Sequence, residues 1–417
     1  MCPVLRVVWL TCAAMVAAIC SAQPTAESLL KEAVTAGSRA RDPQRRAISL
    51  AEVAAAWAGV DSVKYEDTLS EAVAYAKAAR STSTQALALR TVALRIGGAD
   101  PGTAVTLVND AYTLSGQVAT DVDKAVVQRE LCFAADKLGL ESAERITKGA
   151  LEAARQVEDA MLRAACLRDL AQGLKDVELA REVFEQALEA LKLAAIDQAG
   201  YDLAKAELAA CWAAVDLPAA QDLIETIETP RLQSQALVMV ARALAPVSPD
   251  KALALAQEVP AGPQRAYLIA GAAAAMPEGF GSTAQALANA ALQMLGDATG
   301  EAADRTRADI AAALAWNDAE RAISVADNIR EIAEKNKALC IVGDRLAKTE
   351  PRRALAILSA VDDPMLTEPV LTRLAGILAA TDVEEALATS RMILSGRLRV
   401  QALVAIGVAL RARQGGG

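Results

Sequence analysis

The feature that most constrains the fold is an alanine that recurs along the chain at regular intervals. Each copy follows a short polar turn, as in the matching segments 244–253 and 346–355. The marker alanines are Ala104, Ala143, Ala180, Ala220, Ala252, Ala284, Ala322, Ala354 and Ala386. The steps between them are 39, 37, 40, 32, 32, 38, 32 and 32 residues. A unit of 32 residues that recurs with longer variants indicates a tandem array of one supersecondary element, and we interpret the longer steps as units with extended turns.

Apolar residues keep fixed distances from the marker alanine. Twelve residues before it the units carry Leu208, Val240, Ala272, Ile310, Val342 and Leu374, and eight residues before it Trp212, Leu244, Met276, Leu314, Leu346 and Leu378. Residues four apart lie on one face of a helix, so each unit presents a buried stripe. Alanine is also the best intrinsic helix former. The pattern predicts an all-α superhelix, or solenoid, of antiparallel helix pairs, each packed on the next.

Counting units divides the chain into a signal segment and one domain. We expect a single solenoid domain over residues 23–417, with about ten helix pairs and a period near 32 residues. Its first repeats, at 25–100, are irregular and begin with a capping helix, and regular repeats follow at 101–394. A closing first helix at 396–412 lacks a partner helix. With helices about 8–10 Å apart, the array predicts a curved rod roughly 100 Å long.

The first 22 residues read as a cleavable secretory signal peptide. A basic start is followed by the apolar segment 7–19 and by small residues before Gln23. A bilayer requires about 20 apolar residues, and no later stretch of that length is free of charge, so no span is expected after cleavage. We therefore predict a periplasmic or secreted protein. Lipid attachment at Cys20 is the alternative, although Ile19 departs from the small residue that such sites carry there.

Composition removes several classes of function. The chain has 43 basic and 52 acidic residues and no histidine. The absence of histidine excludes Ser-His-Asp triads and His-ligated metal sites, and the acidic balance argues against nucleic acid as a partner. No nucleotide-binding loop is present, so we expect no metal and no cofactor. After signal cleavage Cys132, Cys166, Cys211 and Cys340 remain. We favour buried thiols, with a Cys132–Cys166 disulfide left open.

The repeat unit resembles the tetratricopeptide and HEAT classes of helical repeat over nearly all of the mature chain. The segment Asp382-Val383-Glu384-Glu385-Ala386-Leu387 looks like the start of a tetratricopeptide second helix. The period of 32 differs from the 34 of that class, and its Trp, Gly and Tyr positions mostly carry Ala, Val and Leu. The resemblance implies a surface that binds proteins or peptides, usually without catalysis.

Five residues are candidates for a binding face. Seventeen residues before the marker alanine, successive first helices carry Gln235, Tyr267, Arg305 and Lys337. Stacked first helices place one repeat position on one face of a solenoid, so we expect these side chains to form a ladder. Trp316 falls in a predicted turn, where an aromatic side chain can anchor a partner. A solvated helix face is the structural alternative for the ladder.

We expect a non-catalytic exported scaffold that binds a protein or peptide partner. One alternative is a carbohydrate-active enzyme or sugar-binding protein built on α/α helices, which requires two carboxylates in a cleft beside an exposed aromatic. The other is a structural component of the cell envelope that self-associates through apolar faces at the open ends of the array.

Overall fold

A computed structural model describes residues 24–258 and 262–415, and within them every regular element is helical. The predicted signal peptide and its alternative, lipid attachment at Cys20, lie outside these residues. A 3₁₀ turn, η1, covers Glu278–Phe280. The α-helices are α2 (Ala26–Ser38), α3 (Pro43–Trp57), α4 (Ser62–Lys77), α5 (Thr82–Ile96), α6 (Pro101–Ser115), α7 (Asp121–Lys137), α8 (Ala143–Arg155), α9 (Ala160–Gly173), α10 (Val177–Lys192), α11 (Gln198–Trp212), α12 (Leu217–Glu225), α13 (Pro230–Leu244), α14 (Pro249–Glu258), α15 (Pro263–Ala275), α16 (Gly281–Leu295), α17 (Glu301–Leu314), α18 (Ala319–Asp327), α19 (Ile332–Leu346), α20 (Pro351–Ser359), α21 (Pro364–Leu378), α22 (Val383–Met392) and α23 (Gly396–Gly415).

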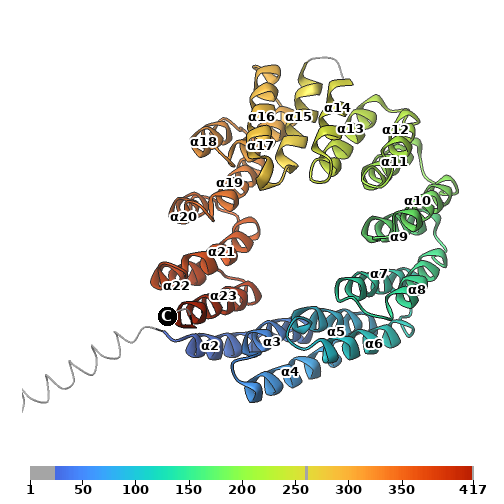
Figure 1. Cartoon of the computed structure of the whole chain (residues 1–417). Coiled ribbons are helices and arrows are strands. Elements are labelled where there is room, and N and C mark those ends of the chain that lie inside the picture. Colours follow the sequence, from blue (N-terminus) through green and yellow to red (C-terminus); the bar gives the residue numbers. More distant parts are fainter. Residues whose placement is uncertain (1–23, 259–261, 416–417) are drawn as a thin grey trace, which may run out of the picture.

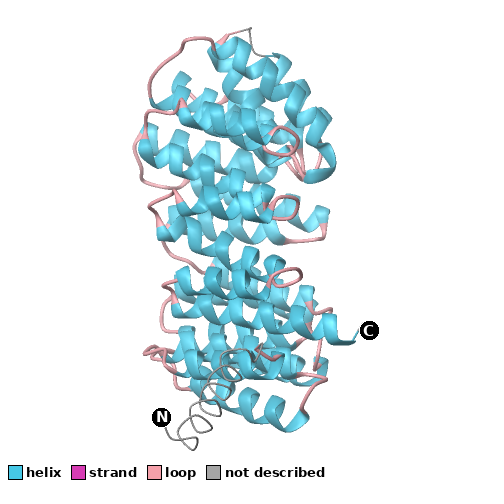
Figure 2. Ribbon diagram, turned by 90° about the vertical axis from the view of Figure 1, so that its left-hand side faces the viewer, coloured by secondary structure: helices cyan, strands magenta, loops and turns pink. Residues whose placement is uncertain are grey.

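The helices form two concentric layers, as the sequence predicts for an αα-solenoid. The odd-numbered helices α3 to α23 make the inner layer, in which each helix packs on the next odd-numbered one. The even-numbered helices lie outside, each against its inner partner (Figure 1). Figure 2 shows the assembly edge-on, with the connecting loops along its two edges. The antiparallel pairing places the turns within pairs on one edge and those between pairs on the other.

The array closes into a ring, and this corrects the expectation of an open rod. Helix α2 packs on α23, and α23 also packs on α3, so the two ends of the chain form an eleventh helix pair (Figure 1). The closing helix, expected to be unpaired, thus finds its partner in the helix expected to be a cap. Gly407 of α23 lies against α2, where a Cβ would be at ordinary van der Waals distance, 3.5 Å, from Leu30 and from the Ala26 carbonyl. Gln401 also donates to Glu52 of α3 over 2.8 Å.

The predicted apolar stripe is confirmed. Every residue twelve or eight positions before a marker alanine in the six regular units is buried. Eight of the nine marker alanines are completely buried, and Ala143 is half-buried. Trp212 stacks on Phe184 with ring centroids 5.6 Å apart, as a core side chain would. Asp100, Asp216 and Asp382 cap the outer helices α6, α12 and α22, since each accepts a backbone N–H from the first turn.

The variable step between units has a different origin from the one we inferred. Units of 32 residues have outer helices of 9 or 10 residues, namely α12, α14, α18 and α20. The longer units have outer helices of 13 to 16 residues, namely α6, α8, α10 and α16. Most of the additional residues therefore extend the outer helix by one or two turns and do not extend the connecting turns. The inner helices α7 to α21 stay between 13 and 17 residues, which keeps the inner layer regular.

A buried carboxylate recurs eighteen residues before the marker alanine, at Asp202, Asp304 and Glu368. Each accepts a backbone N–H from the loop that begins the next inner helix, as Asp202 does from Thr229 over 2.9 Å. Asp202 and Asp304 also pair with a base three residues later, Lys205 at 3.3 Å and Arg307 at 3.1 Å. The repeated acid and its i+3 base are visible in the sequence, but we did not predict their burial, because the apolar stripe gives no reason to single them out.

The pH dependence of stability is expected to reveal the Asp202 contacts. Burial raises the pKa of Asp202, but hydrogen bonds from Thr229 and Lys205 outweigh it and hold the pKa at about 2. An unfolded aspartate titrates near pH 4, so the stabilisation is present above that pH and is lost as the pH falls toward 2. The melting temperature of the wild type should exceed that of Asp202→Asn by a constant margin from pH 7 to about 4.5. This margin should narrow steadily below pH 4, and a margin independent of pH would contradict the assignment.

The four cysteines within the described residues, Cys132, Cys166, Cys211 and Cys340, are free thiols. Cys132 and Cys340 are buried, as expected, whereas Cys166 and Cys211 are half-buried. The Cys132 sulfur lies 3.2 Å from the Thr147 hydroxyl, and no Cys132–Cys166 disulfide is formed. Burial raises the pKa of Cys340 to about 11, so this thiol stays protonated at neutral pH.

Candidate binding site on the inner helices

Three of the five predicted site residues line one pocket. Gln235 on α13, Tyr267 on α15 and Arg305 on α17 border a cavity of about 610 Å³. All of its lining residues belong to these three inner helices, so it opens on the inner face of the ring. Lys337, the fourth member of the predicted ladder, is exposed on the next inner helix, α19, outside the pocket lining. The fifth residue, Trp316, lies elsewhere.

The pocket has an apolar wall and a polar rim. The apolar surface comes from Val238, Met239, Pro263, Tyr267 and Ala302. Polar groups surround it, namely Arg231, Ser234, Gln235, Arg242, Gln264, Arg305, Thr306 and Asp309. A cavity with apolar surface and a few polar groups suits a ligand that has both kinds of surface.

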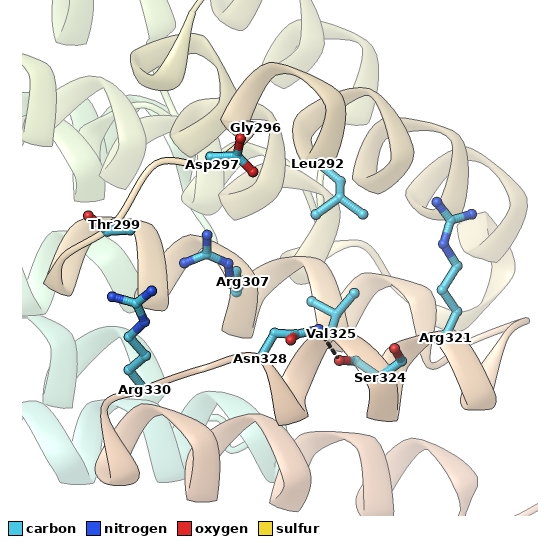
Figure 3. A pocket seen from close by; sticks show the side chains of 10 residues that line it. All are labelled: Leu292, Gly296, Asp297, Thr299, Arg307, Arg321, Ser324, Val325, Asn328 and Arg330. Carbon is cyan, nitrogen blue, oxygen red and sulfur yellow. Dashed lines mark hydrogen bonds between the residues drawn. The ribbon is translucent and has the colours of Figure 1, made fainter.

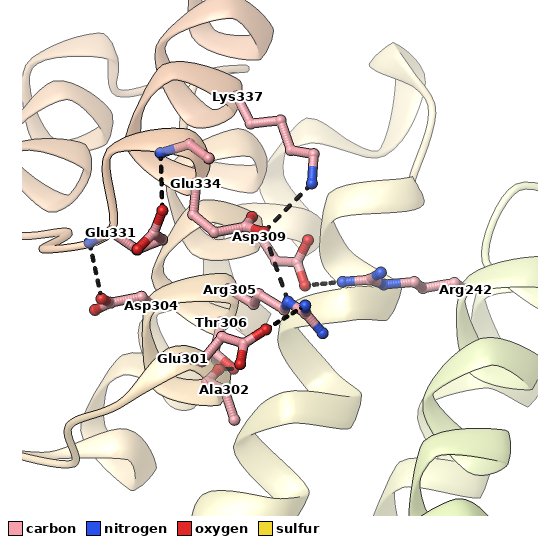
Figure 4. Close-up of polar contacts among 11 residues, drawn as sticks. Arg242, Glu301, Ala302, Asp304, Arg305, Thr306, Asp309, Glu331, Glu334 and Lys337 are labelled. Carbon is pink, nitrogen blue, oxygen red and sulfur yellow. Dashed lines mark hydrogen bonds and ion pairs between the residues drawn. The ribbon is translucent and has the colours of Figure 1, made fainter.

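An ion pair spans the pocket from α13 to α17. Arg242 donates to the Asp309 carboxylate and passes over α15 (Figure 4). Gly271 of α15 makes this crossing possible, because a Cβ there would lie 2.8 Å from the Arg242 Nε. Burial raises the pKa of Asp309, and the Arg242 charge opposes that effect. The pair therefore links two helices that are not neighbours in the inner layer, and forms part of the pocket surface.

A second set of charges links α17 to α19. Arg305 pairs with Glu301 on its own helix and lies 3.5 Å from Glu334 of α19. Glu334 also pairs with Lys337 at 3.3 Å (Figure 4). The ladder residues Arg305 and Lys337 are thus joined through one shared carboxylate. The sequence placed both on one face, but it did not indicate that Glu334 connects them.

Arg231 is the cation at this pocket without an internal partner, since it forms no ion pair with any residue in the described ranges. Its side chain is exposed. We did not predict Arg231, Met239 and Arg242 from the sequence, although a signal was present. These residues lie four before, four after and seven after Gln235, which is the spacing of one helix face.

Trp316 has a contact of its own, away from the pocket. It lies in the turn after α17, as predicted, and is half-buried. The Arg345 guanidinium stacks 4.4 Å from the centre of its ring and donates to the carbonyls of Ala274 and Ala312. Those carbonyls belong to the C-terminal turns of α15 and α17, and the Ala312 carbonyl also accepts the N–H of Ala315. Burial lowers the pKa of Arg345 to about 10. Trp316 thus covers an arginine that ties three inner helices together.

No group of three or more Cys, Asp or Glu side chains is arranged to hold a metal ion within residues 24–258 and 262–415. In the same ranges no helix is both long enough and apolar enough to cross a bilayer.

Comparisons with known proteins add little. No protein-family model matches the chain, and no curated protein matches its sequence. Among solved structures, the chain is similar to the crystal structure of Ton1535 from Thermococcus onnurineus NA1. The two share 15% sequence identity with a TM-score of 0.38, over 76% of this chain and 98% of that one. A likeness of this degree supports no argument about fold or function, so both rest on the geometry of the ring and its pocket.

Proposed function

We propose that this chain is an exported, non-catalytic helical-repeat scaffold that holds a protein or peptide partner against the inner face of its ring. The pocket on α13, α15 and α17 carries the proposal, because it places Gln235, Tyr267 and Arg305 beside an apolar wall. Polypeptide segments present apolar side chains and polar backbone groups together. A site of this composition supplies apolar contact for affinity and polar contact for orientation.

The carboxylates near the pocket favour binding over cleavage. Glycoside hydrolysis requires two acids that exchange protons with the substrate. Asp309 is paired with Arg242, and Glu334 with Arg305 and Lys337. The other alternative, self-association, was based on apolar ends of an open array. In the ring those ends pack on each other, so the apolar residues Leu29 and Leu30 are buried.

A photoreactive amino acid at Gln235 is expected to form discrete adducts with a partner when the protein is irradiated in cell-envelope extract. The same amino acid at Lys148, exposed on the outer helix α8, should form none. Adding Arg231→Glu should reduce the Gln235 adduct at least tenfold, because it reverses a pocket charge that has no internal partner.

Arg80→Glu provides the matched control, since Arg80 is also exposed and has no ion pair with a described residue. It should leave the adduct unchanged. Equal adducts from Gln235 and Lys148, or an adduct insensitive to Arg231→Glu, would place the partner away from this pocket.

A further inference from the structure

A second cavity, of about 560 Å³, lies on the opposite side of α17 from the inner pocket. Its walls come from the outer helices α16 and α18, from α17, from the loop between α16 and α17, and from the loop after α18 (Figure 3). Three arginines line it, Arg307, Arg321 and Arg330, against one carboxylate, Asp297. A concentration of positive charge is unusual on a chain with nine more acidic than basic residues.

Arg321 lacks the carboxylate partners that its counterpart one repeat later possesses. Arg353, also one residue before a marker alanine, pairs with Glu320 at 2.7 Å and Glu350 at 3.3 Å. Glu320 lies two residues before its marker alanine, and in the preceding unit that position carries Ser282, which has no charge to offer Arg321. The position of Glu350 is occupied by Asp318, whose carboxylate accepts the backbone N–H of Arg321 instead. The guanidinium of Arg321 therefore has no ion pair with any residue in the described ranges.

Arg330 is likewise without an ion-pair partner in the described part of the chain, and its side chain is exposed. It lies at the same end of the cavity as Arg307 (Figure 3). Arg307 is held in place, because it donates to Asp304 over 3.1 Å and to the Ala298 carbonyl over 2.6 Å. One fixed and one adjustable guanidinium thus border the same space, and the amide of Asn328 lines the cavity beside them.

We propose that this cavity binds a phosphate group, seated between Arg307 and Arg330. The planar fork of N–H donors on each guanidinium matches the oxygens of a phosphate and forms short, charge-assisted hydrogen bonds. Leu292 and Val325 provide apolar surface for the body of a phosphate ester, and Arg321 lies at the far end for a second negative charge (Figure 3). This site is independent of the proposed partner-binding function.

Thermal unfolding of the full mature chain tests the proposal, since a ligand that binds the folded state raises the melting temperature with its concentration. Inorganic phosphate and glycerol phosphate should both do so relative to chloride at equal ionic strength. The ligand that raises the melting temperature more at equal concentration shows whether the cavity prefers free phosphate or a phosphate ester. Arg330→Gln should raise the phosphate dissociation constant about tenfold, the loss of one charge-assisted contact, whereas Arg321→Gln, at the far end of the cavity, should raise it less. Arg80→Gln should leave it unchanged.

Each exchanged arginine is exposed and has no internal ion pair, so the variants are expected to fold normally. The proposal would be overturned if chloride raised the melting temperature as much as phosphate does. It would also be overturned if phosphate raised the melting temperature of all three variants as much as that of the wild type. Acetate acting as strongly as phosphate would also overturn it, because that result would indicate a site for single carboxylates.

Discussion

Replacing Leu30 with aspartate is expected to lower the free energy of unfolding by about 3–5 kcal/mol and to open the ring. Leu30 is buried where α2 packs on Gly407 of α23, so the substitution removes an apolar side chain and places an unpaired charge in its position. In a solenoid each unit is stabilised by its neighbours, and the terminal units have only one. The α2–α23 pair gives every unit two neighbours, and its loss should allow both ends to unfold locally.

Two measurements distinguish opening from a simple loss of stability. Chemical unfolding should show the lower midpoint, and small-angle X-ray scattering under native conditions should show a larger radius of gyration. Val63→Asp on the nearby helix α4 is the control, because Val63 is 66% exposed and should tolerate the charge. Leu30→Ala should give a smaller loss of stability in a folded protein. If Leu30→Asp and Val63→Asp behave alike in both measurements, α2 does not close the ring in solution.

Removing the Asp202 carboxylate is expected to destabilise the protein by a similar amount, about 3–5 kcal/mol for Asp202→Ala. The side chain is completely buried and pairs with Lys205, whose ammonium also donates to the Thr226 carbonyl over 2.6 Å. Without the carboxylate, Lys205 retains a buried charge that has no counter-ion. The N–H and hydroxyl of Thr229 also lose their acceptor at the start of α13.

A double substitution separates these two costs. Asp202→Ala with Lys205→Met should be more stable than Asp202→Ala alone, because it removes the unpaired charge while the Thr229 N–H still lacks its acceptor. Glu144→Ala, which breaks the exposed pair with Lys148, should leave the stability almost unchanged. The buried ion pair would be contradicted if the effects of Asp202→Ala and Lys205→Met on the free energy of unfolding were additive. It would also be contradicted if Asp202→Ala lowered that free energy no more than Glu144→Ala does.

Only part of the inner pocket could be predicted from the sequence. The ladder residues Gln235, Tyr267 and Arg305 line it together, because a repeat position recurs on one face of the array. The Arg242–Asp309 pair could not be inferred, since it joins helices two apart and depends on the local curvature and on Gly271. Trp316 has the turn position that the sequence gives it, but only the path of the Arg345 side chain shows what covers its ring.

The sequence by itself determined the repeated helix pair and the buried stripe. These depend on residues within one or two units, where helical periodicity and capping act locally. The tertiary structure alone decided that the array is a ring. Closure requires the rotations of eleven pairs to sum to one full turn, about 33° per pair, with little net rise along the axis. A small change in either quantity at each interface accumulates over the whole chain, so a pattern that fixes every unit leaves open whether the two ends meet.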